Sequence, residues 1–417
     1  MKRWYNVVAI LMTTLILSGL FAMACTEPAP PQSTGPITVN IGLPCPLSGP
    51  AGAWGKAGTV YHQAWVDLIN QQGGFKIGNQ TYNIKLVIVD DKNTSEGGAA
   101  AAKQLIYGDN CKFLAGHWSW NFAAISAVTN PAKVIFVTRT GNDAVPGPGG
   151  GYDPVKQPYT VFGTAAAEIY SAYIAALVEY FPDYKKIAII DSTAGKGRGM
   201  DNLFKWCDQN GIRYYSDFYA PGTTDFTPYI TKVVNEGCDI VSFPGDVAGA
   251  LAFNKQRWEA GYKDMKVGTS GPIMDTQLYI NTCGYDAAQG FFGSYAAPWE
   301  FKKTKVDPRY LSMCQEVMQI VSEQQGKTTD YVGWIPWYPT HSEILIQAMQ
   351  KAGTVDDPDA IMEVIRGGTF DAPIGTYKMV GKETYGSPVV FLSSASLGQI
   401  QGDKVVFMVS HASEPLP

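Results

Sequence analysis

The residues of this chain that are best suited to bind a small molecule lie in loops that combine hydrogen-bond donors with aromatic rings. In the segment AGHWSWNFAAISAV, the residues Trp118, Ser119, Trp120 and Asn121 stand directly before an expected helix. A hydroxyl, unpaired N–H groups and two aromatic faces meet there, as small-molecule pockets require. A helix cap with two packed tryptophans is the alternative interpretation.

A second polar loop follows another expected strand, and its side chains are Thr138, Arg139, Thr140 and Asn142. The guanidinium of Arg139 could clamp a carboxylate through two parallel hydrogen bonds. It could equally be an ion-pair partner at the surface or at a hinge. Corresponding strand ends later in the chain carry Lys196, Arg198, Asp246 and Ser270.

The sequence contains no complete motif for catalysis or for nucleotide binding. Gly195, Gly197 and Gly199 lie at a strand-to-helix turn, but Met200 stands where a dinucleotide fingerprint needs its third glycine. No phosphate loop or nucleophile elbow is present. The four histidines have no metal-ligand spacing: His62, His117, His341 and His411. We therefore expect no enzyme activity, no cofactor and no metal.

The stretch 37–70 shows how strands and helices position such loops. An apolar run over residues 37–43 predicts a buried strand, and a loop with Gly49, Gly52 and Gly55 leads from it into a helix. Trp54 and the first helical N–H groups then face the region beyond the strand's carboxyl end, where open α/β sheets bind ligands. A helix start with permissive glycines is the alternative.

Strand and helix patterns alternate in two series, which predicts an α/β fold with two doubly wound lobes. The patterns include helices over residues 200–209 and 340–352 and a strand over 214–219. Between the series, residues 141–158 contain four prolines and five glycines and read as a loop or crossover. We expect lobe 1 to comprise residues 37–158 and about 298–367, and lobe 2 residues 159–297 and about 368–417.

The amino-terminal segment predicts export. Residues 1–24 have Lys2 and Arg3, an apolar core and small residues before Cys25, as in a secretory signal peptide. Cys25 stands where bacterial lipoproteins carry a lipidated cysteine. Plain cleavage is the alternative, because Ala22 occupies a position where lipidation sites usually have leucine. We expect residues 25–36 to form a proline-rich tether.

Charge and cysteine content narrow the function further. Without the signal peptide, 30 basic and 37 acidic residues give a net charge of −7, and no Lys/Arg cluster appears, so we expect no nucleic-acid partner. Six cysteines follow Cys25, and an even number in an exported chain favours disulfides. We expect sequential pairing, with the first pair the best candidate; buried free thiols are the alternative. The six are Cys45, Cys111, Cys207, Cys238, Cys283 and Cys314.

Six phrases, in this order, resemble the type I periplasmic solute-binding proteins, specifically the leucine/isoleucine/valine-binding branch that serves ABC importers. They are PLSGPAGAWGKAG, VDDKNTSEGGAAAAKQLI, AGHWSWNFAAISAV, TTDFTPYITKVVNEGCDIV, HSEILIQAMQKAG and FDAPIGTYKM. The likeness extends over nearly all of residues 37–409. It implies two lobes joined by three crossovers, a ligand in the cleft between them, and closure by hinge bending.

The resemblance also implies roles for site residues. Trp54 matches an aromatic residue that covers the pocket. In the family, hydroxyl and N–H groups of the first lobe hold the ligand's carboxylate, and they correspond here to Ser119, Trp120, Asn121, Thr138, Thr140 and Asn142. Trp118 and Arg139 stand among them.

The second lobe departs from the family pattern. Amino-acid binders hold the ligand's ammonium with aromatic residues and an acid, and the matching positions here are Lys196, Asp246 with Val247, and Ser270. Either Asp246 substitutes for the missing acid or the ligand lacks an amine.

We therefore expect a monomeric, extracytoplasmic binding protein that captures a small carboxylate-bearing solute, an amino acid or an organic acid, and delivers it to membrane permease subunits. A nucleotide-dependent enzyme on similar lobes and a sensor that feeds a signalling receptor are the alternative functions.

Overall fold

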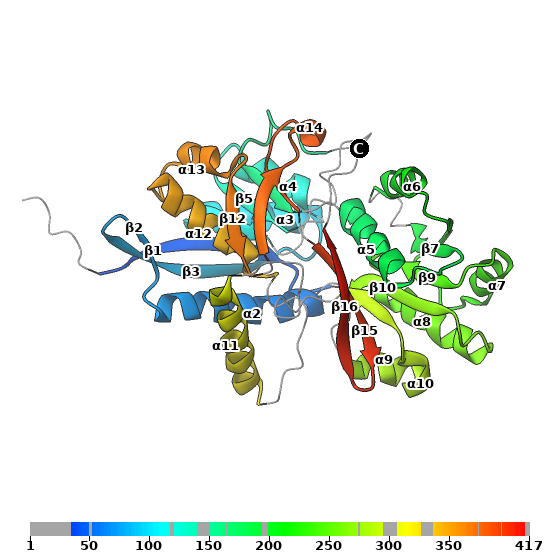
Figure 1. The fold of residues 1–417 in the computed structure, drawn as a ribbon. Coiled ribbons are helices and arrows are strands. Elements are labelled where there is room, and N and C mark those ends of the chain that lie inside the picture. The colour runs from blue at the N-terminus through cyan, green and yellow to red at the C-terminus, as the bar shows by residue number, and fades with distance from the viewer. Residues whose placement is uncertain are drawn as a thin grey trace, which may run out of the picture. The chain divides into compact units, whose positions relative to one another are not determined.

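Two β-sheets with helices packed against them make up the described part of the protein (Figure 1). The computed structural model describes residues 35–49, 52–116, 121–139, 151–163, 166–193, 199–273, 276–294, 307–326, 337–373, 375–392 and 394–412. Nearly all of these belong to one unit, Thr38–Pro417. Within the described residues, no helix is both long and apolar enough to cross a membrane.

The first sheet has nine strands in the order β12-β13-β14-β6-β5-β4-β1-β3-β2. Its centre is parallel, because β4 pairs in parallel with β1 and β5, and β6 with β5 and β14. The strands are β1 Ile37–Cys45, β2 Phe75–Ile77, β3 Gln80–Asp90, β4 Phe113–Gly116, β5 Ile135–Thr138, β6 Thr160–Gly163, β12 Thr369–Ala372, β13 Gly375–Val380 and β14 Val390–Phe391. The accompanying helices are α2 Gly52–Gln71, α3 Ser95–Lys103, the π-helical turn η1 Gln104–Gly108, α4 Phe122–Thr129, α11 Pro308–Gln325, α12 Thr340–Ala352, α13 Pro358–Ile365 and α14 Lys382–Tyr385.

The second sheet has seven strands in the order β16-β15-β11-β10-β9-β7-β8; the pairs from β11 to β8 are parallel, and β15 is antiparallel to both of its neighbours, β11 and β16. The strands are β7 Ile187–Ser192, β8 Tyr214–Tyr219, β9 Ile240–Phe243, β10 Lys266–Pro272, β11 Phe292–Ser294, β15 Ser394–Gln401 and β16 Lys404–Ala412. The helices are α5 Ala166–Tyr180, α6 Met200–Gln209, α7 Thr227–Asn235, α8 Val247–Glu259, α9 Thr276–Cys283 and α10 Tyr285–Ala288. The predicted α/β class and its doubly wound sheets are therefore confirmed.

The chain passes between the sheets three times: after β6, after β11 and after β14. This matches the three predicted crossovers, but the predicted boundaries are wrong for two segments. Residues 160–163 and 369–391 were expected in lobe 2, yet their strands β6, β12, β13 and β14 belong to the first sheet. The strands on either side of the proline- and glycine-rich segment 141–158, β5 and β6, pair with each other in the first sheet, so the chain does not change sheets between them.

Alternation along β1 explains how the first sheet holds helices on both faces. Cys45 faces α2, since a Cβ on Gly55 would lie 2.9 Å from its Sγ. Gly42 faces the opposite way, toward η1, where a Cβ would lie 3.1 Å from the Leu105 side chain. Side chains alternate between the two faces of the strand, and those of the helices repeat every 3.6 residues, so the apolar side chains of both pack into one buried core.

The same alternation divides the second sheet between two cores. Ile187 and Ile189 of β7 pack in the core that contains residues of α5 and α6. Ala188 and Ile190 pack in the core with α7, α8, α9 and α10. Figure 1 shows α8, α9 and α10 gathered along one side of β9 and β10. Both faces of this sheet are covered, as a parallel sheet requires.

Candidate functional site

The carboxyl ends of β4 and β5 lie level with each other at one edge of the first sheet. Gly116 pairs in register with Thr138, and the N–H of Arg139 donates to the carbonyl of Gly116 at 3.2 Å. Asn121 stands next to this edge, at the start of α4. The structure therefore brings Asn121, Thr138 and Arg139 to the edge where open α/β sheets bind ligands.

Two acids at the end of β3, which the sequence analysis did not select, organise the neighbouring loops. Asp90 accepts hydrogen bonds from the N–H of Leu47 at 2.8 Å and from the hydroxyl of Ser48 at 2.6 Å, so it holds the loop after β1. Burial raises the pKa of Asp91, and hydrogen bonds from the Asn93 N–H and the Asn121 side chain oppose that shift. Consecutive acids directly after a strand were the sequence feature that could have identified them.

Arg139 lies in the protein interior, which excludes the surface ion pair considered as its alternative role. The residue is 7% exposed, and its guanidinium carbon lies 4.2 Å from the centre of the Trp337 ring. Burial lowers the pKa of Arg139 to about 9, and the phenols of Tyr338 and Tyr377 oppose that shift. The charge of Arg139 also acts on His341, whose pKa burial lowers to about 3. We call these residues the Arg139 cluster: Arg139, Tyr338, His341 and Tyr377.

On the second sheet, Asp246 and Ser270 have structural partners. Asp246 caps α8 by accepting the N–H of Gly249 at 2.9 Å, and it also accepts the hydroxyl hydrogen of Tyr219. Ser270 accepts the N–H of Gly245 at 3.1 Å and is buried. Both side chains therefore hold the loop between β9 and α8. Tyr219 was missed because its hydroxyl reaches Asp246 from the end of a different strand, β8.

Several predicted residues cannot be placed. Trp118, Ser119, Trp120, Thr140, Asn142, Lys196 and Cys25 lie outside the described residues. Trp54 belongs to α2, but its side chain is outside the description. For these positions the ligand-binding and lipidation roles stay predictions.

The described histidines are not arranged as metal ligands. His62 is buried, its Nε2 lies 2.7 Å from the Ser342 hydroxyl, and burial lowers its pKa to about 3. His411 lies far from it in sequence and approaches Glu179 at 4.0 Å. In the part of the chain that the structure describes, no group of three or more His, Cys, Asp or Glu residues could hold a metal ion.

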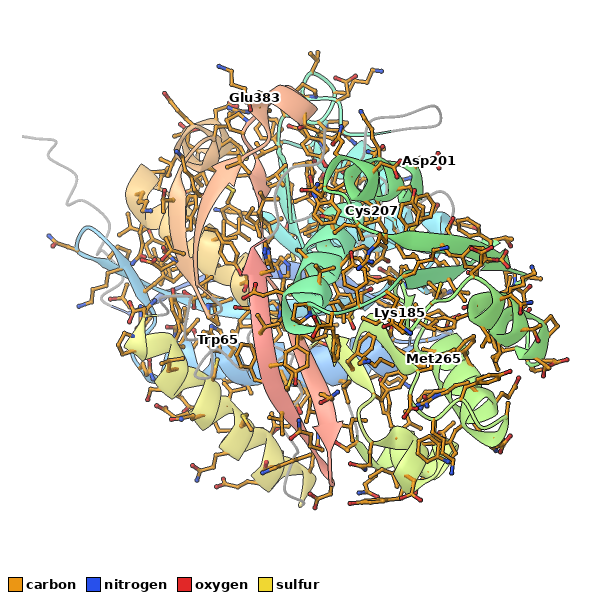
Figure 2. The ribbon with its side chains drawn as sticks, turned by 45° about the vertical axis from the view of Figure 1, so that its right-hand side comes forward. Trp65, Lys185, Asp201, Cys207, Met265 and Glu383 are labelled. Atoms are coloured by element: carbon orange, nitrogen blue, oxygen red, sulfur yellow. The ribbon has the colours of Figure 1, made fainter. Side chains whose placement is uncertain are left out.

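The predicted disulfides are contradicted. Cys111, Cys207, Cys238, Cys283 and Cys314 are buried free thiols, and Cys45 is also buried. In the parallel pair of β1 and β4, Ile41 is level with Phe113, so Cys111 is level with residue 39 and lies about 20 Å from Cys45 along the strand. A disulfide needs Cα atoms within about 7 Å. The other expected pairs fall in different cores, and Figure 2 labels Cys207, which belongs to helix α6 beside the second sheet.

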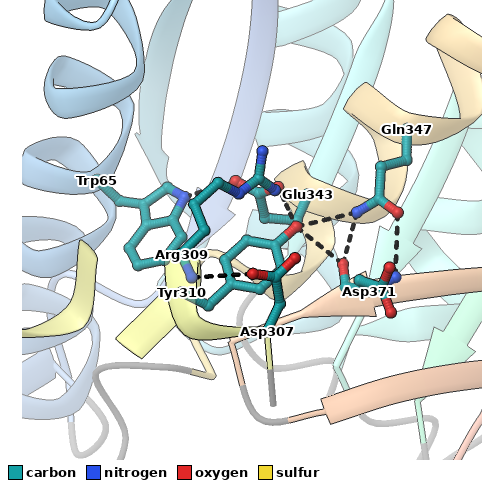
Figure 3. Close-up of polar contacts among 7 residues, drawn as sticks. All are labelled: Trp65, Asp307, Arg309, Tyr310, Glu343, Gln347 and Asp371. Carbon is teal, nitrogen blue, oxygen red and sulfur yellow. Dashed lines mark hydrogen bonds and ion pairs between the residues drawn. The ribbon is translucent and has the colours of Figure 1, made fainter. Parts of the chain in front are cut away.

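A separate polar cluster surrounds the buried carboxylate of Glu343 (Figure 3). Glu343 accepts the indole N–H of Trp65 at 2.9 Å and the hydroxyl of Tyr310 at 2.8 Å, and Arg309 approaches it at 3.7 Å. Burial raises its pKa, and the hydrogen bonds from Trp65 and Tyr310 oppose that shift. The carboxylate thus joins α2, α11 and α12.

A pocket of about 600 Å³ lies beside the Glu343 cluster. It is lined by the carboxyl end of α2, by β2, by the start of α11 and by α12. The predicted ligand loop precedes the other end of α2, which is 20 residues and therefore about 30 Å long. The pocket is accordingly remote from the carboxyl ends of the strands.

Comparisons with known proteins agree with this architecture. A sequence model of the periplasmic binding protein family matches residues 38–390. The Leu/Ile/Val-binding protein BraC3 of Rhizobium johnstonii is 27% identical over 377 residues, which cover 88% of this chain and 93% of that protein.

Solved structures show the same fold at low identity. A solute-binding protein of an ABC transporter from R. palustris, in complex with 4-hydroxybenzoate, has a TM-score of 0.66 and 19% identity, covering 91% of this chain and 98% of that one. The branched-chain amino acid binding protein of Streptococcus pneumoniae, in complex with isoleucine, has a TM-score of 0.66 and 16% identity, covering 91% and 100%. The chain belongs to the periplasmic binding protein family, whose members are extracytoplasmic solute-binding proteins of ABC transporters and not enzymes.

Proposed function

We propose that the protein binds a small solute that carries a carboxylate and needs no amine, such as an aromatic or aliphatic organic acid, in the cleft between its two lobes. The observation that carries this proposal is the bonding of Asp246. One carboxylate oxygen accepts the Gly249 N–H and the other accepts the hydroxyl hydrogen of Tyr219. Because both oxygens hold the start of α8, Asp246 is a poor substitute for the acid that pairs with an ammonium.

Ser270 supports the same proposal. It stands where the family's amino-acid binders have an acid, and its hydroxyl accepts the Gly245 N–H at 3.1 Å. A hydroxyl supplies no counter-charge, and burying an ammonium without one costs several kcal/mol. An amine-free ligand avoids that cost.

We propose that the first lobe holds the solute's carboxylate and that aromatic side chains pack on its body. Asn121, Thr138 and Arg139 lie together at the carboxyl edge of the first sheet. The remaining predicted contacts are Trp54, Trp118, Ser119, Trp120, Thr140 and Asn142, with Lys196 from the second lobe.

The fold by itself does not choose between amino acids and organic acids. The R. palustris protein holds 4-hydroxybenzoate and the S. pneumoniae protein holds isoleucine, and this chain matches both with a TM-score of 0.66. The choice must therefore come from residues such as Asp246 and Ser270.

Calorimetric titration of the purified mature chain tests the proposal. We expect binding of 4-hydroxybenzoate or an aliphatic monocarboxylate and no binding of leucine, isoleucine or valine. Ser270→Glu should weaken binding of the acid by repulsion, whereas Ser270→Ala, which also loses the bond from Gly245, is the matched uncharged control. Binding of the three amino acids without any response to organic acids would overturn the proposal.

We further propose that the protein is monomeric and anchored to the membrane by a lipid on Cys25. The support for the anchor is the signal-peptide pattern of residues 1–24 and the proline-rich tether that follows. Membrane fractionation tests the anchor: the wild-type protein should sediment with membranes and Cys25→Ala should not. Equal distribution of both proteins would contradict lipidation.

A further inference from the structure

The Arg139 cluster places a cation and two phenols in one buried region. Arg139 lies over the Trp337 ring at 4.2 Å, and its charge acts on the phenols of both Tyr338 and Tyr377. Tyr377 and His341 share a neighbour, because their rings lie 5.7 Å and 6.1 Å from that of Phe391. The hydrogen-bond donors of the cluster therefore come from three elements: the end of β5, the segment before α12, and β13.

Tyr377 supplies an independent observation. Its side chain is buried, and its hydroxyl has no hydrogen-bond partner in the described part of the chain. A buried hydroxyl without a partner destabilises the folded protein. Because the charge of Arg139 acts on this phenol, a negatively charged acceptor is favoured at the Tyr377 hydroxyl.

The start of α12 adds positive potential to the same region. Tyr338 precedes this helix and His341 is its second residue. The N-cap is Pro339, which makes no side-chain hydrogen bond to the first turn. The amino end of a helix carries a partial positive charge, so it favours an anion as the guanidinium does.

We propose that the Arg139 cluster is a binding site for a monoanion, held by the guanidinium of Arg139 and the hydroxyls of Tyr338 and Tyr377. The anion has two sources: the carboxylate of the transported solute, or a small free ion such as chloride or formate. The first source rests on the proposed function, and the second is independent of it. Neither Tyr338 nor Tyr377 is among the ligand residues that the family resemblance implies.

Tyr377→Phe tests the site with the smallest change. Arg139 is unsuitable for the test because its removal alters a packed charge. Tyr173→Phe is the matched control, since the Tyr173 hydroxyl is also buried without a partner in the described residues but lies in the core of the second sheet. Thermal unfolding and calorimetric titration are carried out on the full mature chain, in sulfate buffer of constant ionic strength, with chloride, formate or 4-hydroxybenzoate as the probe.

We expect at least one probe to raise the Tm of the wild-type protein and of Tyr173→Phe equally, and Tyr377→Phe to bind that probe about tenfold more weakly. Stabilisation by chloride or formate alone assigns the site to a free ion. Chloride competing with 4-hydroxybenzoate assigns it to the solute's carboxylate.

The inference is overturned if no probe raises the Tm above that in sulfate, or if Tyr377→Phe and Tyr173→Phe respond alike. Solute binding that Tyr377→Phe leaves unchanged would remove the anion site but keep the proposed function. Chloride binding without binding of any solute would keep the anion site and contradict the proposed function.

Discussion

Replacing Tyr310 by phenylalanine removes one hydroxyl from the Glu343 cluster and keeps the ring. That hydroxyl donates to Glu343 at 2.8 Å, lies 3.1 Å from the carbonyl of Asp371, and accepts from Gln347 at 3.1 Å. The ring stacks on Trp65 with centroids 6.1 Å apart, and phenylalanine retains this packing. Tyr310→Phe therefore isolates the hydrogen bonds.

The expected cost follows from the charge of the acceptor. Above the raised pKa of Glu343 the acceptor is a carboxylate, and a hydrogen bond to a charged group contributes roughly 1.5–3 kcal/mol; Glu343 keeps its bond from Trp65 at 2.9 Å. We expect a loss of about 2–3 kcal/mol. With an unfolding entropy of about 2.1 cal/mol/K per residue, that loss lowers the Tm of a chain of this size by about 2–4 °C.

Differential scanning calorimetry of the apo protein is the assay. If the lobes unfold in separate transitions, the loss should fall on the transition of the first sheet, because α2, α11 and α12 pack there. Tyr173→Phe is the control: it removes a buried hydroxyl with no partner in the described residues, so we expect little change or a small gain in stability. Equal losses in both variants, or an unchanged Tm for Tyr310→Phe, would refute the reasoning.

Two further predictions concern titratable groups. Burial raises the pKa of Glu343 above its ordinary value of 4.5, so its contribution to stability is complete below that pH and is lost as the pH rises through the raised pKa. The Tm advantage of the wild-type protein over Glu343→Gln should therefore be larger at about pH 5 than at about pH 8, and a constant difference would contradict this. Burial also raises the pKa of the Cys111 and Cys207 thiols to about 12 and that of Cys238 to about 11. Native protein should not react with a thiol reagent, whereas denatured protein should react without prior reduction; a requirement for reductant would reveal disulfides.

Local patterns were sufficient for much of the fold. The predicted helices over residues 200–209 and 340–352 and the predicted strand over 214–219 match α6, α12 and β8. Their apolar periods are strong and their ends carry clear turn residues, so neighbouring residues alone determine them. The two short strands β2 and β11 and the helices α9 and α10 were missed because their patterns are too brief to show a period.

Features that depend on distant residues could not be predicted. Nothing local distinguishes a strand of the first sheet from one of the second, so Thr160–Gly163 was placed in the wrong lobe. The expected bond between Cys45 and Cys111 failed for the same reason, since strand order alone does not show that they lie at opposite ends of a parallel pair. Among the site residues, Asp246 looked like a free acid because its partner Tyr219 comes from another strand.

Helix α12 connects the buried carboxylate of Glu343 with the Arg139 cluster. His341 and Glu343 are two residues apart, and side chains two apart on a helix point about 200° away from each other. His341 accordingly lies by Phe391 of the sheet, within the influence of Arg139, while Glu343 lies by Trp65 and Tyr310 on α2 and α11. The Glu343 carboxylate thereby fixes the helix whose first turn borders the Arg139 cluster. Tyr310→Phe, which removes a hydrogen bond to Glu343, should therefore weaken anion binding at the Arg139 cluster, although Tyr310 is not part of that cluster. Tyr173→Phe, in the core of the second sheet, should leave the same binding unchanged.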